Sequence, residues 1–147
     1  MVTSIQEVYA RNMQSLINEI GAYNNETVLW STAPGILNSA GNLALHLAGN
    51  LQFFMGTYLG NTGYVRDRDK EFSDKNVPQQ TVIELLRHTH NVIQETLSGL
   101  RDDQMNDPYP IDKFGEGKTI GYVLNYLLAH LNYHLGQINY HRRLLSK

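Results

Sequence analysis

Three histidines have the spacing that could hold a metal ion. His130 and His134 are four residues apart, so on a helix they lie within about 40° of each other and one turn apart. His46 has a matching place on another helical pattern, at the edge of a stripe that includes Leu43 and Leu47. Three neutral imidazoles would leave further coordination positions of the ion open for water or substrate. We therefore expect one divalent ion at His46, His130 and His134, in a site of the catalytic type.

The same three residues also have a plainer interpretation. A histidine at the edge of an apolar stripe is more often a hydrogen-bonded core residue than a ligand, and pairs four apart arise by chance. Leu131 follows His130, so the glutamate that serves as general base in the H-E-x-x-H motif of zinc proteases is absent. A helical bundle whose histidines bind no metal is therefore a competing hypothesis, and it predicts that purified protein retains no metal.

The remaining three histidines do not fit the same site. His88 and His90 are about 200° apart around a helix, so they cannot bind one ion together. His88 is expected in solvent, and His90 is expected in the core or as a partner that orients a ligand. His141 shares the wheel position of His134 but lies about 10 Å further along the axis, which is too far for the same ion.

Two amides lie close to the predicted triad in sequence. Asn50 follows His46 by one turn, and Gln137 follows His134 by three residues. Both are candidates for hydrogen bonding to a substrate or to a metal ligand, although a helix-surface amide is more often structural. The two helices that carry the triad hold no Asp or Glu close to it, so no general acid or base is visible. This absence weakens a hydrolase interpretation and favours thiolate transfer.

The residues that must position these groups follow a helical pattern. Four windows carry the apolar period of 3.6 residues, and no segment alternates as a strand would. The windows cover about 3–23, 38–60, 78–99 and 120–145. The expected starts are Asn38 or Ser39, Pro78 and Thr119. The sequence predicts an all-α protein with four long helices, forming a single domain over residues 1–147.

Composition limits the class of protein. The 147 residues are 41% hydrophobic and 18% charged, which excludes a disordered chain. No run approaches the ~18 apolar residues of a membrane span, and no export signal is visible, so we expect a cytoplasmic protein. There are no cysteines, so a metal must bind nitrogen or oxygen. The net charge of −2 includes no basic stripe, and nucleic-acid binding is not expected.

The helical pattern gives no role to the two long connections or to a row of tyrosines on the last predicted helix. The polar segment 61–76 is either a mobile loop or a lid, and segment 101–118 is a crossover with two prolines and one short helical turn. Four loop aromatics could close over a pocket: Tyr64, Phe72, Tyr109 and Phe114. Four tyrosines of the last helix could form a partner surface, although such residues are more often partly buried: Tyr122, Tyr126, Tyr133 and Tyr140.

The segments 42–50 and 129–138 resemble the DinB/YfiT-like superfamily. Its pattern places a histidine on the second helix and an H-x-x-x-H-x-G-Q arrangement on the last, which here are His46 and residues 130–137. The resemblance covers nearly the whole chain. It implies an up-up-down-down four-helix bundle, frequent homodimers, and a divalent ion such as zinc, nickel or iron at His46, His130 and His134.

The resemblance does not imply one reaction. Some members are similar to metal-dependent thiol S-transferases and others to hydrolases or isomerases. The first hypothesis is therefore a metal-dependent enzyme that acts on a small molecule, in which the ion lowers the pKa of bound water or of a thiol. The second is a non-catalytic metal-binding or stress-response module that acts through dimer contacts.

Overall fold

The computed structural model describes residues 1–147, and it is all-helical, as the sequence predicts. The two isolated β-bridges do not form a sheet. The α-helices are α1 (Val2–Gly21), α2 (Glu26–Leu29), α3 (Ala40–Leu51), α4 (Arg68–Ser73), α5 (Gln79–Ser98) and α6 (Ile120–Leu145). A π-helical turn, η1 (Gln52–Thr57), continues α3, and two 3₁₀ turns, η2 (Asp102–Asn106) and η3 (Asp112–Phe114), precede α6.

The long helices begin where side chains can cap them. The Ser39 side chain accepts a hydrogen bond from the Asn42 backbone N–H at the start of α3, and Thr119 does the same for Tyr122 at the start of α6. Such caps satisfy backbone donors that have no partner within the helix. Both predicted caps are confirmed. Pro78 occupies the capping position of α5 rather than its first turn.

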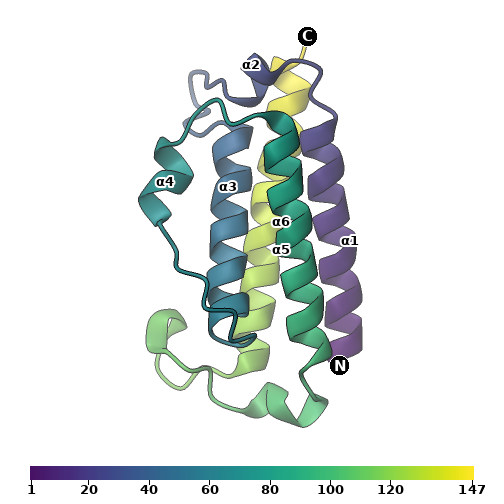
Figure 1. Ribbon diagram of the computed structural model, residues 1–147, viewed down its shortest axis with the longest axis vertical. Coiled ribbons are helices and arrows are strands. Elements are labelled where there is room, and N and C mark those ends of the chain that lie inside the picture. The colour runs from purple at the N-terminus through teal and green to yellow at the C-terminus, as the bar shows by residue number, and fades with distance from the viewer.

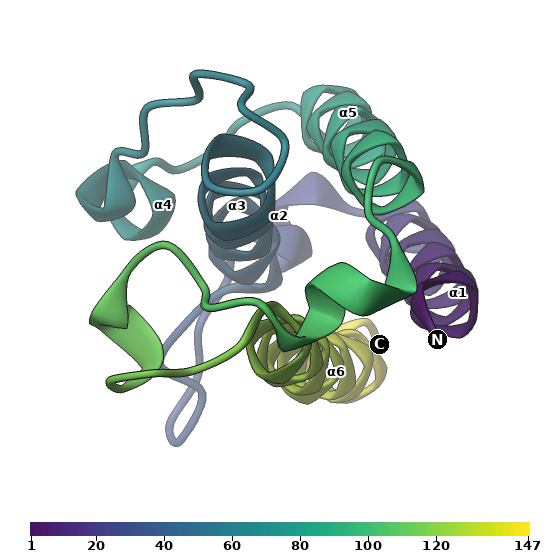
Figure 2. The same ribbon diagram turned by 90° about the horizontal axis from the view of Figure 1, so that it is seen from below.

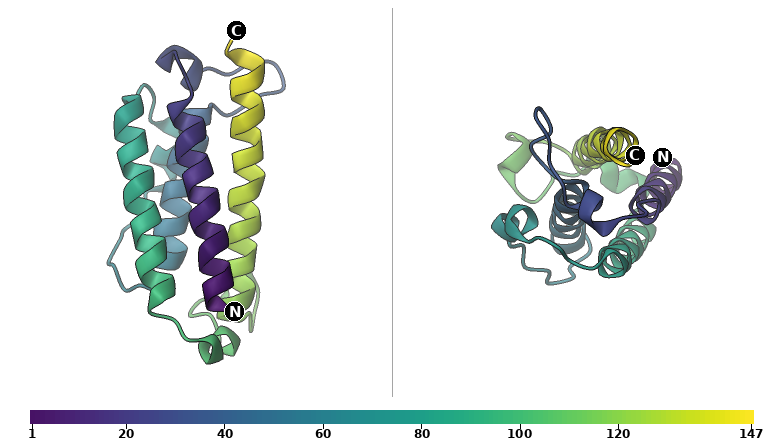
Figure 3. Two further views of the ribbon diagram at one scale, coloured as in Figure 1. Left: turned by 90° about the vertical axis from the view of Figure 1, so that its right-hand side faces the viewer. Right: turned by 90° about the horizontal axis from the view of Figure 1, so that it is seen from above.

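Four long helices lie side by side around one continuous core (Figure 1). α1 packs against α5 and α6, and α3 packs against the same two helices from the other side. The left view in Figure 3 shows α1 between α5 and α6. The buried Tyr9 hydroxyl donates to the Leu124 carbonyl at 2.5 Å, which ties α1 to α6.

The directions of these helices differ from the order that the resemblance implies. α1 and α6 run upward in Figure 1, whereas α3 and α5 run downward. The contact between Tyr9 and Leu124 joins the first halves of α1 and α6, so these two helices are parallel. Gln79 at the start of α5 donates to the Ile20 carbonyl near the end of α1, so these two are antiparallel. The order along the chain is up-down-down-up, and the expected up-up-down-down order is wrong.

The paths of two connections explain this order. The connection from α1 to α3 stays at one end of the molecule and includes α2, so α3 returns antiparallel to α1 (Figure 1). The connection from η1 to α5 instead runs back along α3, and within it α4 packs against α3. Seen along the long axis, α4 lies outside α3, on the side away from α1 (Figure 2). No helix is both long enough and apolar enough to cross a membrane.

Candidate metal centre

Three imidazoles meet between α3 and α6. His46 Nε2 lies 3.2 Å from His130 Nε2, and His134 Nε2 lies 3.1 Å from the same atom. One ring nitrogen of each of the three residues lies within 4.8 Å of the others. The spacing of His130 and His134 therefore brings both rings to one point, and α3 supplies the third ring from across the interface.

The distances between the ring nitrogens fit a shared ion. Imidazole nitrogens bind zinc at about 2.0–2.1 Å, which puts two ligands roughly 3.4 Å apart at a tetrahedral angle and roughly 2.9 Å apart at a right angle. The observed 3.1 and 3.2 Å fall between these limits. The donor set is thus suited to a divalent transition metal, and the three histidines are close enough to bind one.

Glu71 sets the tautomer of the first histidine. Its Oε1 lies 3.0 Å from His46 Nδ1, and the carboxylate is held in turn by the Nε and Nη2 atoms of Arg66, each at 2.8 Å. Burial raises the pKa of Glu71, but the hydrogen bonds from Arg66 and His46 outweigh it and hold the pKa below its usual value. The ionised carboxylate accepts a hydrogen bond from the Nδ1–H group of His46, which leaves the Nε2 lone pair free for a metal.

Gln137 plays the same part for His134. The Gln137 Oε1 atom lies 2.6 Å from His134 Nδ1. An amide oxygen can only accept, so His134 carries its proton on Nδ1 and directs the Nε2 lone pair at the other two histidines. The candidate role of Gln137 as a partner of a ligand agrees with this contact. His130 has no such partner, because its buried Nδ1 makes no hydrogen bond.

The surroundings keep the two histidines of α6 neutral. Burial, together with the neighbouring His134 and His46, lowers the pKa of His130 to about 4. Burial also lowers the pKa of His134, against the hydrogen bond that His134 Nδ1–H donates to Gln137, which raises it. Metal ligation requires neutral imidazole, so the lowered pKa values of these two histidines favour binding near neutral pH.

The contact between Glu71 and His46 depends on a glycine. Gly49 lies in the middle of α3, where glycine costs about 1 kcal/mol relative to alanine. A Cβ at this position would lie 2.6 Å from the Glu71 carboxyl carbon, and closer still to its Oε2. The absence of a side chain therefore lets α4 approach α3 closely enough for Glu71 to reach His46.

Asn42 fixes the other end of α4. Its buried Nδ2 donates to the carbonyls of Glu71, at 3.0 Å, and of Asp74, at 2.8 Å. Lys75 Nζ donates back to the Asn42 Oδ1. Segment 61–76 is therefore neither structureless nor free of α3, and the interpretation as a lid agrees better with the structure than that of a mobile loop.

A cavity of about 790 Å³ opens beside the triad. His46 and His130 form part of its wall, whereas His134 does not line it. Asn50 also lines it, is only 7% exposed, and its Oδ1 has no hydrogen-bond partner. A buried amide oxygen without a partner can accept a hydrogen bond from a ligand in the cavity.

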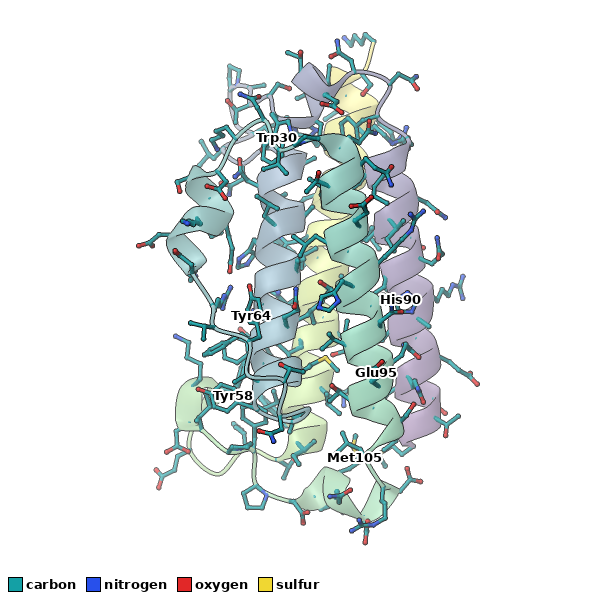
Figure 4. The ribbon with its side chains drawn as sticks, viewed as in Figure 1. Trp30, Tyr58, Tyr64, His90, Glu95 and Met105 are labelled. Carbon is teal, nitrogen blue, oxygen red and sulfur yellow. The ribbon has the colours of Figure 1, made fainter.

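The loop aromatics meet the site in different ways. Tyr64 and Phe114 line the cavity, and Figure 4 shows Tyr58 and Tyr64 beside the lower part of α3. Phe72 packs on the His46 ring, with 4.9 Å between centroids. Tyr109 is buried and donates to the Phe54 carbonyl at 2.7 Å. The four tyrosines of α6 are exposed rather than partly buried, at 45% to 65%: Tyr122, Tyr126, Tyr133 and Tyr140.

The remaining histidines lie outside the triad. His88 is exposed, as expected. His90 is half-buried on α5 (Figure 4) and makes no hydrogen bond, so neither of its expected roles is seen. His141 is a satisfied core residue, with Nδ1 2.7 Å from the Tyr23 hydroxyl and Nε2 2.9 Å from the Ser31 carbonyl.

Two residues of the site were missed from the sequence. Glu71 and Arg66 come from the connection before α5, so a carboxylate reaches the triad from outside the two helices that carry it. The carboxylate contacts the far nitrogen of His46 and is paired with Arg66, which suits orientation of the ring rather than proton transfer. The signal that could have revealed it is Gly49, a glycine one turn after His46 within an apolar helix.

Comparison with known proteins gives a family. Residues 3–147 match the family described as "Protein of unknown function (DUF1572)". The match covers nearly the whole chain, so the protein belongs to this family. Searches of curated proteins and of solved structures found no significant match.

Proposed function

We propose that this chain is a single DinB/YfiT-like four-helix-bundle domain, residues 1–147, that binds one divalent transition-metal ion and acts as a metal-dependent enzyme on a small molecule. His46, His130 and His134 would hold the ion, which would be zinc, nickel or iron. The observation that carries the proposal is the convergence of three Nε2 atoms, two of them with their tautomers set by Glu71 and Gln137.

The arrangement of the chain suggests how the site would work. Three protein ligands would leave room for a water or a substrate on the ion, which, when bound, would lower the pKa of that water or of a thiol. Glu71 and Gln137 orient the rings, and Asn50 would accept a hydrogen bond from the ligand in the cavity. The aromatic side chains of the cavity would exclude water from it.

The missing free base favours thiol S-transfer over hydrolysis. Glu71 is the carboxylate in contact with the triad, and both of its oxygens are bonded to Arg66. A hydrolase would gain from a free carboxylate or histidine that takes a proton from water. A thiol loses its proton more readily than water, so a reaction that uses a thiol as nucleophile would depend less on such a base.

An alternative function rests on the exposed tyrosines of α6. A non-catalytic metal-binding or stress-response module that acts as a homodimer would use a surface such as that of Tyr122, Tyr126, Tyr133 and Tyr140. This alternative shares the metal site with the enzyme proposal, but it acts through dimer contacts and has no turnover.

Activity assays separate the two functions. Metal-loaded protein is assayed for conjugation of thiols to electrophiles and for ester hydrolysis, with His46→Ala as the test variant and His88→Ala, on the exposed face of α5, as the matched control. The enzyme proposal predicts turnover that His46→Ala abolishes and His88→Ala retains. Metal-loaded protein without turnover across both panels would contradict it and support the module.

A further inference from the structure

The wall of the cavity beside the triad is largely aromatic. Eight of its fourteen lining residues are hydrophobic. A volume of about 790 Å³ lies within the range of sites for small organic ligands. The aromatic side chains that line it are Phe53, Phe54, Tyr58, Tyr64, Phe114 and Tyr126. These surfaces suit a ligand with a planar or aliphatic body.

The charges of the same wall have a single sign. Arg66, Arg68 and Lys113 line the cavity, and no Asp or Glu does. Arg66 is neutralised by Glu71, but Arg68 and Lys113 form no ion pair. This excess of positive charge stands out in a chain whose net charge is −2. A cleft lined by one sign of charge concentrates ligands of the opposite sign.

The metal site would add to this excess. The three histidine ligands are neutral as ligands, so they would not offset the charge of a divalent ion. Asn50, buried and with its Oδ1 unpaired, adds to the cavity wall a polar group that selects for a hydrogen-bond donor. The cavity thus combines an apolar surface, uncompensated cations and one unsatisfied amide.

We infer that this cavity binds a small amphipathic anion, namely an aromatic or aliphatic body that carries a carboxylate, sulfonate or phosphate group. Arg68 and Lys113 attract the anionic group, and the aromatic wall holds the body next to His46 and His130. The inference rests on the proposed function, because it names the class of ligand for the same site.

A pair of fluorescent probes tests this inference. 1-Anilinonaphthalene-8-sulfonate and N-phenyl-1-naphthylamine share their rings and differ by the sulfonate. Both are titrated into chelator-treated protein, which isolates the cavity from the ion. We expect the anionic probe to bind roughly tenfold more tightly than the neutral one, in line with the worth of a charged hydrogen bond. Equal affinities for the two probes would overturn the inference.

Variants locate the binding. Arg68→Gln combined with Lys113→Gln should reduce the affinity for the anionic probe to about that for the neutral probe and leave the latter unchanged. Asn50→Asp, which puts a carboxylate on the wall at nearly constant shape, should weaken only the anionic probe. Arg87→Gln combined with Lys147→Gln removes two exposed cations that do not line the cavity, and should change neither. An equal loss in this control would place the anion elsewhere and overturn the inference.

The metal content of the same preparations is measured separately. If the metal binds and the probes are not discriminated, the ligand class is wrong and the metal centre stands. If the metal-free protein prefers the anionic probe and no metal binds, the ligand class stands and the proposed function is wrong. With metal bound, preference for the anionic probe should increase further.

Discussion

Glu71 lies 25 residues after His46 in the sequence, yet its Oε1 is 3.0 Å from His46 Nδ1. Both side chains are buried, with 6% and 8% of their surface exposed. The same His46 ring presents its Nε2 to His130 on the opposite side. The His46 imidazole therefore connects the Glu71 carboxylate on α4 with the two histidines on α6. The geometry of the candidate metal centre thus depends on where α4 packs.

The first prediction concerns this carboxylate. Glu71→Ala removes the acceptor for His46 Nδ1, so the ring loses both its preferred tautomer and its orientation. Partners of metal-bound histidines typically contribute 10–100-fold to affinity. We expect the dissociation constant for zinc to rise by about that factor, as measured by competition with a chromogenic chelator.

Two further variants control this measurement. Glu71→Gln keeps an oxygen that can accept from Nδ1 and should retain affinity within about tenfold of the original protein. Glu84→Ala removes an exposed carboxylate of α5 and should have no effect. Unchanged zinc affinity in Glu71→Ala would show that the contact with His46 does not support the site.

The second prediction uses two glycines in long helices. Replacement of a helical glycine by alanine normally gains up to about 1 kcal/mol. Gly136 on α6 has no atom within 4 Å of a built Cβ, so Gly136→Ala should gain this amount. Gly49→Ala should instead lower the free energy of unfolding by about 1–3 kcal/mol, because the new Cβ collides with the Glu71 carboxylate.

Urea denaturation of both variants provides the comparison. Gly49→Ala should also weaken zinc binding, since displacement of Glu71 releases His46. A gain in stability in both variants would mean that α4 does not pack on α3 at this distance.

The third prediction concerns a pH-dependent contact between α1 and α6. Glu19 accepts hydrogen bonds from Arg142 Nε and from Asn139 Nδ2, both at 2.7 Å. Burial raises the pKa of Glu19, but these bonds outweigh it and hold the pKa below its usual value. A carboxyl with a lowered pKa in the folded state stabilises the protein above its unfolded pKa of about 4.3. That stabilisation is lost as pH falls through the folded pKa.

Glu19→Gln should therefore cost about 0.5–1 kcal/mol of unfolding free energy at neutral pH, an amount suited to a partly exposed pair. The difference from the original protein should shrink as pH is lowered below about 4. Glu7→Gln, at an exposed position of α1 without an ion pair, is the control. Urea denaturation of these proteins from neutral pH to below about pH 4 measures the difference in unfolding free energy. A difference that does not depend on pH would show that the ionised Glu19 carboxylate does not stabilise the fold.

The long helices and the pairing of His130 with His134 follow from local patterns. Apolar residues at helical spacing, with Ser39 and Thr119 as caps, predict α6, and α3 together with the η1 turn that continues it, within a few residues. The spacing of His130 and His134 predicts that both rings face one point. Such features depend on residues within one or two turns, so periodicity is sufficient to find them.

The path of the chain between helices does not follow from such patterns. Glu71 and Arg66 reach His46 only because the connection after η1 turns back along α3, and the same turn decides the direction of α5. A polar segment of this length can end at either end of a bundle, so the sequence pattern left the helix directions open, and the order that the resemblance implied is wrong (Figure 1). The π-helical turn that carries Phe53 and Phe54 into the cavity wall also lacks a recognisable sequence signal.

The central claim is that His46, His130 and His134 together bind a metal. Elemental analysis of protein purified without an affinity tag tests it most directly, with His130→Ala prepared in parallel. We predict about one ion of zinc, nickel or iron per chain in the original protein, and less than about a tenth of that in the variant. Protein that retains none of these metals, even after incubation with them and dialysis, would contradict the account.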